Sequence, residues 1–150
     1  MESGKQTVLE KTLTAVQHSG LPYYVVTQTD NPDGGMGDSI AAGVRATMAA
    51  NGWLILPADM PWILPETIRA VAKTLQNCTQ PGSHSIVMPQ FQGERGHPVG
   101  FAAHCAADLL ALRGDEGART LVAKYAVHLL DVNDAGCVKD VDVVGDLLTL

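Results

Sequence analysis

The chain has 150 residues, of which 46% are hydrophobic and 17% charged, so it suits one globular domain with a substantial core and is not disordered. Its formal net charge of -6 argues against a nucleic-acid partner, which needs a basic patch, and no stretch is apolar enough for a membrane span. The polar N-terminus is not typical of a signal peptide, and the three cysteines lack the CxxC spacing of a zinc site. We therefore expect a cytoplasmic protein with reduced cysteines that serve as small buried residues.

Helix and strand patterns alternate along the chain. Amphipathic spacing predicts helices, and short β-branched or apolar runs predict strands. In chain order we expect a helix over 7–18, a strand over 23–27, a loop over 30–35, a helix from Asp38 or Ser39 to residue 50, a strand over 53–56, a helix over 65–75, strands over 84–89 and 98–102, helices over 106–112 and 116–124, a strand over 126–132 and a short helix over 143–148. This alternation predicts an α/β fold: a three-layer, Rossmann-like, mostly parallel sheet with helices on both faces.

One carboxylate stands out in this pattern. Asp59 follows the apolar strand over 53–56 and lies between Pro57 and Pro61. Parallel sheets bind ligands outside the carboxyl ends of their strands, which makes Asp59 a candidate functional residue. Aspartate is also common in turns, so position alone leaves a turn residue and a functional carboxylate both open.

Five segments resemble, in the expected order, the MobA-like NTP transferase family. They are "GGMGDSIAAGV" (34–44), "LPADMP" (56–61), "GERGHPVGF" (93–101), "GDEGARTLV" (114–122) and "VKDVDVVGDLL" (138–148). The family includes the enzymes that attach CTP or GTP to the molybdenum cofactor. The resemblance implies the nucleotide-diphospho-sugar transferase type of fold, in a single domain over residues 1–150.

The resemblance also implies a reaction. A nucleotide would pass from CTP or GTP to the phosphate of a molybdopterin-type cofactor, pyrophosphate would leave, and Mg²⁺ would offset the phosphoryl charge. By resemblance, Asp59 is the catalytic residue and a metal ligand, and Asp142 is a second metal ligand. Asp140 competes with Asp142 for that role, and a solvated strand end is the alternative for both.

Two further groups of residues receive roles from the resemblance. Gly35, Gly37 and Ser39 would bind the nucleotide near its base or ribose, the alternative being a glycine turn with an ordinary serine cap. His97 and Arg119 would contact the second substrate. The alternatives are an exposed loop histidine and an arginine paired with an acid. A molybdoenzyme or a chaperone is a candidate protein partner, and neither nucleic acid nor membrane is expected.

The chain departs from the family pattern at its N-terminus. The family opens with a strand and a glycine-rich loop, roughly Leu-Ala-Ala-Gly-x-Ser-x-Arg-Met-Gly, which holds the triphosphate; "GKQTVLEKTL" (4–13) resembles the segment after that loop. We therefore expect an incomplete domain whose transferase activity is impaired unless the loop is supplied. Since the family's first strand would lie between strands 23–27 and 53–56, we expect these two to pair directly or to flank a gap.

Two other functions stay open from the sequence. The chain could be a non-catalytic relic that binds a nucleotide, a cofactor or a partner protein. A weaker alternative is a sugar-phosphate nucleotidyltransferase, from which the Gly-His-Pro and Gly-Ala-Arg segments lean away.

Overall fold

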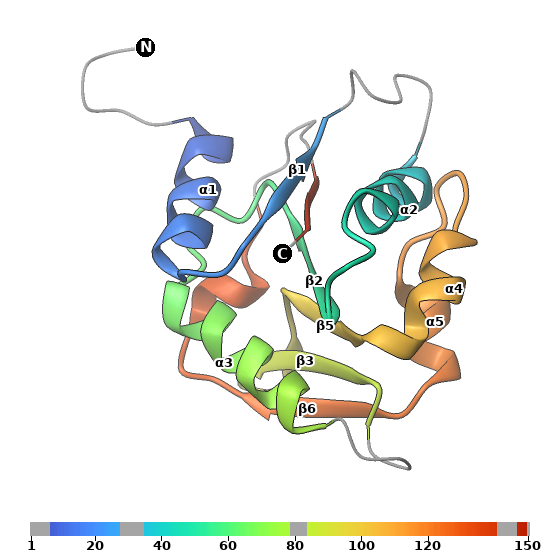
Figure 1. Ribbon diagram of the computed structural model, residues 1–150. Helices are drawn as coiled ribbons and strands as arrows, with labels where there is room; N and C mark the ends of the chain where they lie inside the picture. The colour runs from blue at the N-terminus through green and yellow to red at the C-terminus, as the bar shows by residue number, and fades with distance from the viewer. Residues whose placement is uncertain (1–6, 28–34, 79–83, 141–146, 150) are drawn as a thin grey trace.

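A seven-stranded mixed sheet forms the centre of the molecule. The computed structural model describes residues 7–27, 35–78, 84–140 and 147–149, the last three by their backbone. The strands lie in the order β1-β7-β2-β5-β3-β4, with β6 on the other side of β3 (Figure 1). Their bounds are β1 (Tyr24–Val26), β2 (Gly52–Pro57), β3 (Ile86–Phe91), β4 (Glu94–Arg95), β5 (Val99–Ala102), β6 (Val127–Asp131) and β7 (Leu147–Thr149).

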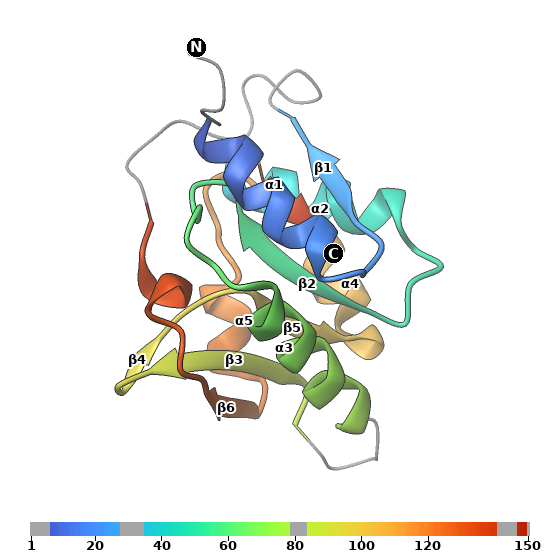
Figure 2. The ribbon, with the colours of Figure 1, turned by 90° about the vertical axis from the view of Figure 1, so that its left-hand side faces the viewer.

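Helices cover both faces of this sheet. One face carries α1 (Val8–His18) and α3 (Pro65–Asn77), which lie in front of the strands in Figure 2. The other carries α2 (Met36–Ala46), α4 (Ala106–Leu110) and α5 (Arg119–Lys124). Two short 3-10 helices, η2 (Ala103–Cys105) and η3 (Ala135–Val138), complete the described elements. The three layers of the predicted α/β fold are thus confirmed. No helix in the described part of the chain is long and apolar enough to cross a membrane.

Each face of the sheet has its own hydrophobic cluster. The α1–α3 cluster includes Val16, Leu56, Met60, Ile63, Ile68, Val71 and Cys137. The α2–α4–α5 cluster includes Ile40, Val44, Trp53, Phe101, Leu109 and Leu121. Alternate residues of β2 supply both clusters, since successive side chains of a strand point to opposite faces.

Local sequence signals explain the start of two helices. Thr7 and Glu10 form a capping box at α1: the Glu10 N–H donates to Thr7 Oγ1 at 3.1 Å, and the Thr7 N–H donates to Glu10 Oε1 at 2.9 Å. Pro65 occupies the first position of α3, where its missing N–H costs nothing. The predicted helices over 7–18 and 65–75 are therefore confirmed. The other predicted elements up to β6 are present with ends that differ by at most four residues, and the short strand β4 was not predicted.

The prediction of a mostly parallel sheet was wrong. Strands β1, β2, β3 and β6 share one direction, but among the described residues only β3 and β6 are hydrogen-bonded parallel neighbours. β5 follows the β3–β4 hairpin with no helix between them, and a parallel crossover needs a dozen or more residues. β5 therefore runs antiparallel to both of its neighbours, β2 and β3.

The prediction for the end of the chain was also wrong. Residues 147–149 form the strand β7 instead of the end of a helix, and residues 143–146 lie outside the described ranges. β7 pairs antiparallel with β1 on one side and with β2 on the other. β1 and β2 therefore neither pair directly nor flank a gap. A short apolar run does not distinguish a helix from a strand. Here the pairing with two distant strands, β1 and β2, makes residues 147–149 a strand.

Removing β7 should weaken the sheet at β1. We expect a chain without residues 147–150 to lose on the order of 2 kcal/mol of unfolding free energy, because β1 and β2 both lose backbone hydrogen bonds to β7. Urea unfolding gives the measurement, and a chain without Leu150 alone is the control. Equal unfolding midpoints for the two truncations would contradict the expected role of β7.

Candidate functional site

The candidate site lies at the edge of the sheet where β2, β3 and β6 end and β5 begins. β3 and β6 are parallel, with Gln90 beside Asp131, so their carboxyl ends lie together. Ile55 of β2 pairs with Val99 of the antiparallel β5, which brings the segment before β5 beside the end of β2. In sheets of this kind ligands bind outside the carboxyl ends of the strands.

The loop after β2 holds Asp59 in a fixed position. The carbonyl oxygen of Ala58, the preceding residue, accepts a hydrogen bond from Thr12 Oγ1 of α1 at 2.8 Å. On the other side, Met60 and Ile63 are buried in the α1–α3 cluster, while Asp59 itself is half-buried. The structure therefore places Asp59 at the end of an interior strand, as expected, and its metal-binding role stays a prediction.

A buried carboxylate that the sequence analysis missed ties this loop to η3. Asp134 accepts hydrogen bonds from Leu64 N at 3.1 Å, Thr67 Oγ1 at 2.6 Å and Gly136 N at 2.8 Å. It thereby caps the start of α3 and holds the first turn of η3 against it. The only sequence signal was the general preference of aspartate for turns before glycine, which says nothing of partners near residue 65.

Two glycines let three segments approach each other closely. A side chain at Gly136 would clash with the carbonyl of Trp62, and one at Gly96 would clash with the carbonyl of Cys137. The His97 N–H donates to that same Cys137 carbonyl at 2.9 Å. Residues 58–64, 96–98 and 134–138 thus pack into one unit, which we call the strand-end cluster.

Burial keeps His97 uncharged in this cluster. Burial lowers the pKa of the half-buried His97 imidazole, and the nearby Asp140 carboxylate opposes that shift only in part. The ring is therefore neutral at physiological pH and can both donate and accept a hydrogen bond. Asp140 is exposed beside it, whereas Asp142, the predicted second metal ligand, lies outside the described residues.

The predicted nucleotide-binding glycines have a structural role of their own. α2 begins at Met36, earlier than expected, and the Gly37 N–H donates to the Gly114 carbonyl at 2.8 Å. A side chain at Gly35 would clash with Gly114 and Asp115. Two of the motifs that resemble the family therefore lie against each other. This contact explains the glycines without a ligand, and nucleotide binding by Gly35, Gly37 and the half-buried Ser39 stays a prediction.

The structure does not bring Arg119 to His97. Arg119 is the exposed first residue of α5, whose Leu121 packs in the α2–α4–α5 cluster. The strand-end cluster packs instead on the α1–α3 side through Cys137. A shared role of Arg119 and His97 toward one substrate therefore needs a ligand large enough to reach both.

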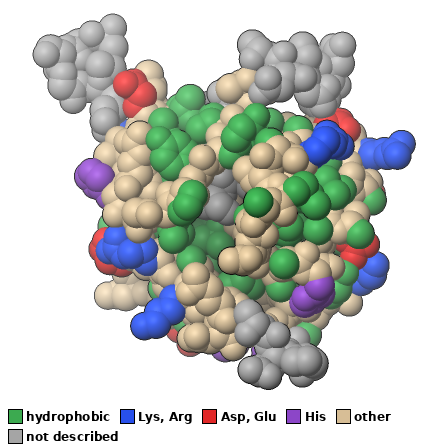
Figure 3. All heavy atoms as spheres, in the orientation of Figure 1, with side chains coloured by type: hydrophobic (Ala, Val, Ile, Leu, Met, Phe, Trp, Pro, Cys, Tyr) green, Lys and Arg blue, Asp and Glu red, His purple; other side chains and the backbone are tan. Residues whose placement is uncertain are grey.

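The described residues offer few charged groups for a metal or a triphosphate. Among residues 7–27, 35–78, 84–140 and 147–149, no group of three or more His, Cys, Asp or Glu side chains could hold a metal ion. Figure 3 shows the Lys and Arg side chains spaced around the rim of one face, with hydrophobic side chains nearer its middle. Asp59 would thus act as one of few protein ligands, which suits Mg²⁺ because that ion keeps waters and phosphate oxygens in its shell.

The cysteines fit the structural role predicted for them. Cys105 and Cys137 are fully buried, and burial raises the pKa of each thiol to about 11. Both thiols therefore stay protonated and unreactive at physiological pH. Cys78, at the end of α3, is half-buried.

Comparisons with known proteins agree with this architecture. The model of a family described as the MobA-like NTP transferase domain matches residues 4–129. The purine catabolism protein PucB of Bacillus subtilis (strain 168) is 31% identical over 113 residues, which cover 72% of this chain and 52% of PucB. The chain thus spans about half the length of that curated relative.

Three solved structures have a similar fold, each with a TM-score of 0.73 over 95% of this chain. They are Rv0371c from Mycobacterium tuberculosis H37Rv (20% identity, 82% of that chain), the same protein in complex with manganese (21%, 84%) and its homologue from Mycobacterium sp. strain JC1 (22%, 80%). At these identities the likeness shows the fold: a mixed sheet flanked by helices.

Proposed function

Because this chain belongs to the MobA-like NTP transferase domain family, we propose that it transfers a nucleotide from CTP or GTP to the phosphate of a molybdopterin-type cofactor. Asp59 carries the proposal: a half-buried carboxylate, fixed at the end of an interior strand by anchors on both sides. Burial and fixed geometry suit a group that must place charge beside a reacting phosphate.

The proposed reaction is a displacement at the α-phosphorus of the nucleotide. A phosphate oxygen of the second substrate attacks that phosphorus, the bond to the β-phosphate oxygen breaks, and pyrophosphate leaves. Asp59, with Asp140 or Asp142, would hold Mg²⁺, and the bound ion would offset the charge on the phosphoryl oxygens. The solved manganese complex of Rv0371c, whose fold is similar, supports a divalent ion.

The two substrates would meet different elements. The start of α2, with Gly35, Gly37 and Ser39, would hold the nucleotide near its base or ribose. The neutral His97 would hydrogen-bond the second substrate, and Arg119 would reach the same substrate from α5. Because the buried thiols suit a reducing compartment, we place this chemistry in the cytoplasm, with a molybdoenzyme or chaperone receiving the product.

Substitution of Asp59 tests this proposal. We expect Asp59→Asn to weaken the Mg²⁺-dependent affinity for CTP or GTP at least about 10-fold while the unfolding midpoint stays near that of the wild type, since asparagine keeps the shape of the side chain but removes the charge that would hold the ion. Calorimetric titration with and without Mg²⁺ gives the affinities.

Asp131→Asn is the matched control, because Asp131 is an exposed carboxylate at the end of β6, on the same edge of the sheet. It removes the same charge at the same edge of the sheet and should leave nucleotide affinity unchanged. If wild type and Asp59→Asn bind the nucleotide equally well with and without Mg²⁺, Asp59 is a turn residue and the proposal fails.

A further inference from the structure

Two large apolar side chains of the strand-end cluster point into solvent. Trp62 is 52% exposed and Leu64 is 41% exposed. Both belong to the short loop between β2 and α3. Their neighbours Met60 and Ile63 are only 2% and 3% exposed. The loop therefore alternates between anchors in the core and apolar side chains on the surface; we call Trp62 and Leu64 the loop patch.

The backbone that carries the loop patch is fixed. Ile63 N donates to Met60 O at 3.3 Å, and Leu64 N donates to the buried Asp134 at 3.1 Å. Gly136 of η3 packs directly against the Trp62 carbonyl. A flexible loop could turn its tryptophan inward, but this one holds the indole outward on a rigid support. Such a preorganised aromatic surface loses little conformational entropy when it binds a flat partner.

The loop patch lies beside the groups that the proposed reaction uses. Trp62 follows Asp59 by three residues. Gly136 of η3 packs against the Trp62 carbonyl, and Cys137 of the same η3 accepts a hydrogen bond from the backbone N–H of His97. Single apolar residues on a surface need no explanation, but these two are separated by one residue, lie on fixed backbone and belong to the loop that carries Asp59. Exposed tryptophan on fixed backbone is the residue type that dominates binding energy at recognition sites.

We propose that Trp62 stacks on the planar heteroaromatic ring of the second substrate, with Leu64 packing against the ring edge. The identity of that ring as a pterin rests on the proposed function. Stacking on an aromatic side chain suits any flat ring and leaves the phosphate of the same molecule free to reach Asp59 and the neutral His97. Trp62 is then a positioning and specificity residue for the acceptor.

The nucleotide base is a poorer occupant of the loop patch. Its proposed site, at the start of α2, belongs to the helix layer that packs in the α2–α4–α5 cluster. The loop patch is anchored in the α1–α3 cluster, on the other face of the sheet. Two ring sites on opposite faces can hold donor and acceptor at once, which a displacement between two substrates requires.

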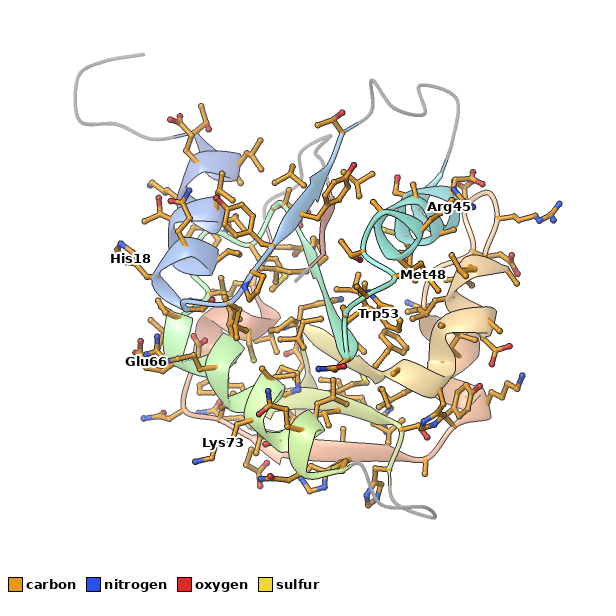
Figure 4. All side chains as sticks on the ribbon, viewed as in Figure 1. His18, Arg45, Met48, Trp53, Glu66 and Lys73 are labelled. Atoms are coloured by element: carbon orange, nitrogen blue, oxygen red, sulfur yellow. The ribbon has the colours of Figure 1, made fainter. Side chains whose placement is uncertain are left out.

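The two tryptophans of the chain allow a direct test. Trp53 is 2% exposed and donates from Nε1 to Thr47 Oγ1 at 3.0 Å, and Figure 4 shows its ring inside the fold. Its emission should be blue-shifted and insensitive to added ligand, whereas that of Trp62 should be red-shifted and quenched by a stacked ring. The probe is a stable pterin that carries a phosphate group, titrated against the wild type, Trp62→Phe and Trp62→Ala.

In the wild type we expect the pterin to quench the red-shifted emission. In Trp62→Phe only Trp53 emits, and we expect no quenching of that emission. The Trp62→Phe titration also corrects for light absorbed by the pterin. Calorimetry should show about 10-fold weaker pterin binding by Trp62→Ala and nearly unchanged binding by Trp62→Phe, since phenylalanine still stacks. Absence of quenching at millimolar pterin, or equal affinity in Trp62→Ala, overturns the proposal and leaves the loop patch as a protein contact.

A nucleotide titration separates this proposal from the function it rests on. If CTP and GTP bind with Mg²⁺ but the pterin does not quench Trp62, the ring site is wrong and the transferase proposal stands. If the pterin quenches Trp62 but no nucleotide binds, the ring site stands and the transferase proposal fails. Should Trp62→Ala not fold, Trp62→Leu keeps the apolar contact without a flat ring and decides the same question.

Discussion

Replacing Asp134 by alanine should lower the free energy of unfolding by about 4 kcal/mol. Two buried donors, Thr67 Oγ1 and Gly136 N, and the partly buried Leu64 N lose their common acceptor. Each buried donor without a partner costs roughly 1–3 kcal/mol. Because Asp134 is 5% exposed, water does not easily replace the lost carboxylate. Urea unfolding followed by tryptophan emission measures the change.

Two variants bound the interpretation of this loss. Asp131→Ala removes an exposed carboxylate whose one described hydrogen bond comes from Gln90, and it should change stability by no more than about 0.5 kcal/mol. Asp134→Asn keeps one acceptor oxygen and should fall between the two. If Asp134→Ala unfolds at the same urea concentration as Asp131→Ala, the carboxylate does not hold η3 to α3.

Extension of the chain should raise its activity at least about 100-fold. We propose that the 150-residue chain alone transfers nucleotide poorly, because its residues include no glycine-rich loop of the family type to hold the triphosphate. Each donor that stabilises reacting phosphates contributes on the order of 100-fold in rate, although the contributions need not add. The measurement is pyrophosphate release from CTP or GTP, with molybdopterin cofactor and Mg²⁺, before and after adding the family's strand and loop ahead of Lys5.

The position of β7 shapes this experiment. β7 fills the place between β1 and β2 where the added strand is expected, so the extension must displace it. Removal of residues 147–150 from the extended chain should therefore preserve or increase the gain. An extension with a scrambled loop is the control. Fast turnover by the 150-residue chain alone contradicts the expected impairment. If the extension does not raise the activity, a protein that binds its ligands without catalysis is favoured.

The sequence predicted those features that local signals determine. Amphipathic spacing predicted α1, and Pro65 marked the start of α3. The apolar run before Asp59 placed that residue at the end of β2. Each of these signals lies within a few residues of the feature that it predicts. The family resemblance added the order of the segments but not the contacts between them.

Distant pairings could not be predicted in the same way. Asp134 bonds to Leu64 and Thr67, which are 70 and 67 residues away, and no local pattern marks such a partner. The antiparallel direction of β5 could have been predicted, because no helix separates β5 from β3. Gly35 shows a different limit: a glycine that admits the backbone of the chain itself looks the same in sequence as one that admits a ligand.

The place of β7 also has a consequence for how the protein is made. On the ribosome β1 and β2 are synthesised long before Thr149, yet β7 is the strand that joins them. Until that residue emerges, the nascent sheet has two open edges whose unpaired N–H and C=O groups can capture another chain. Translation that stalls before Leu147 therefore yields polypeptides that contain most of the core but have unpaired strands at β1 and β2. We expect chaperones and proteases to recognise such polypeptides.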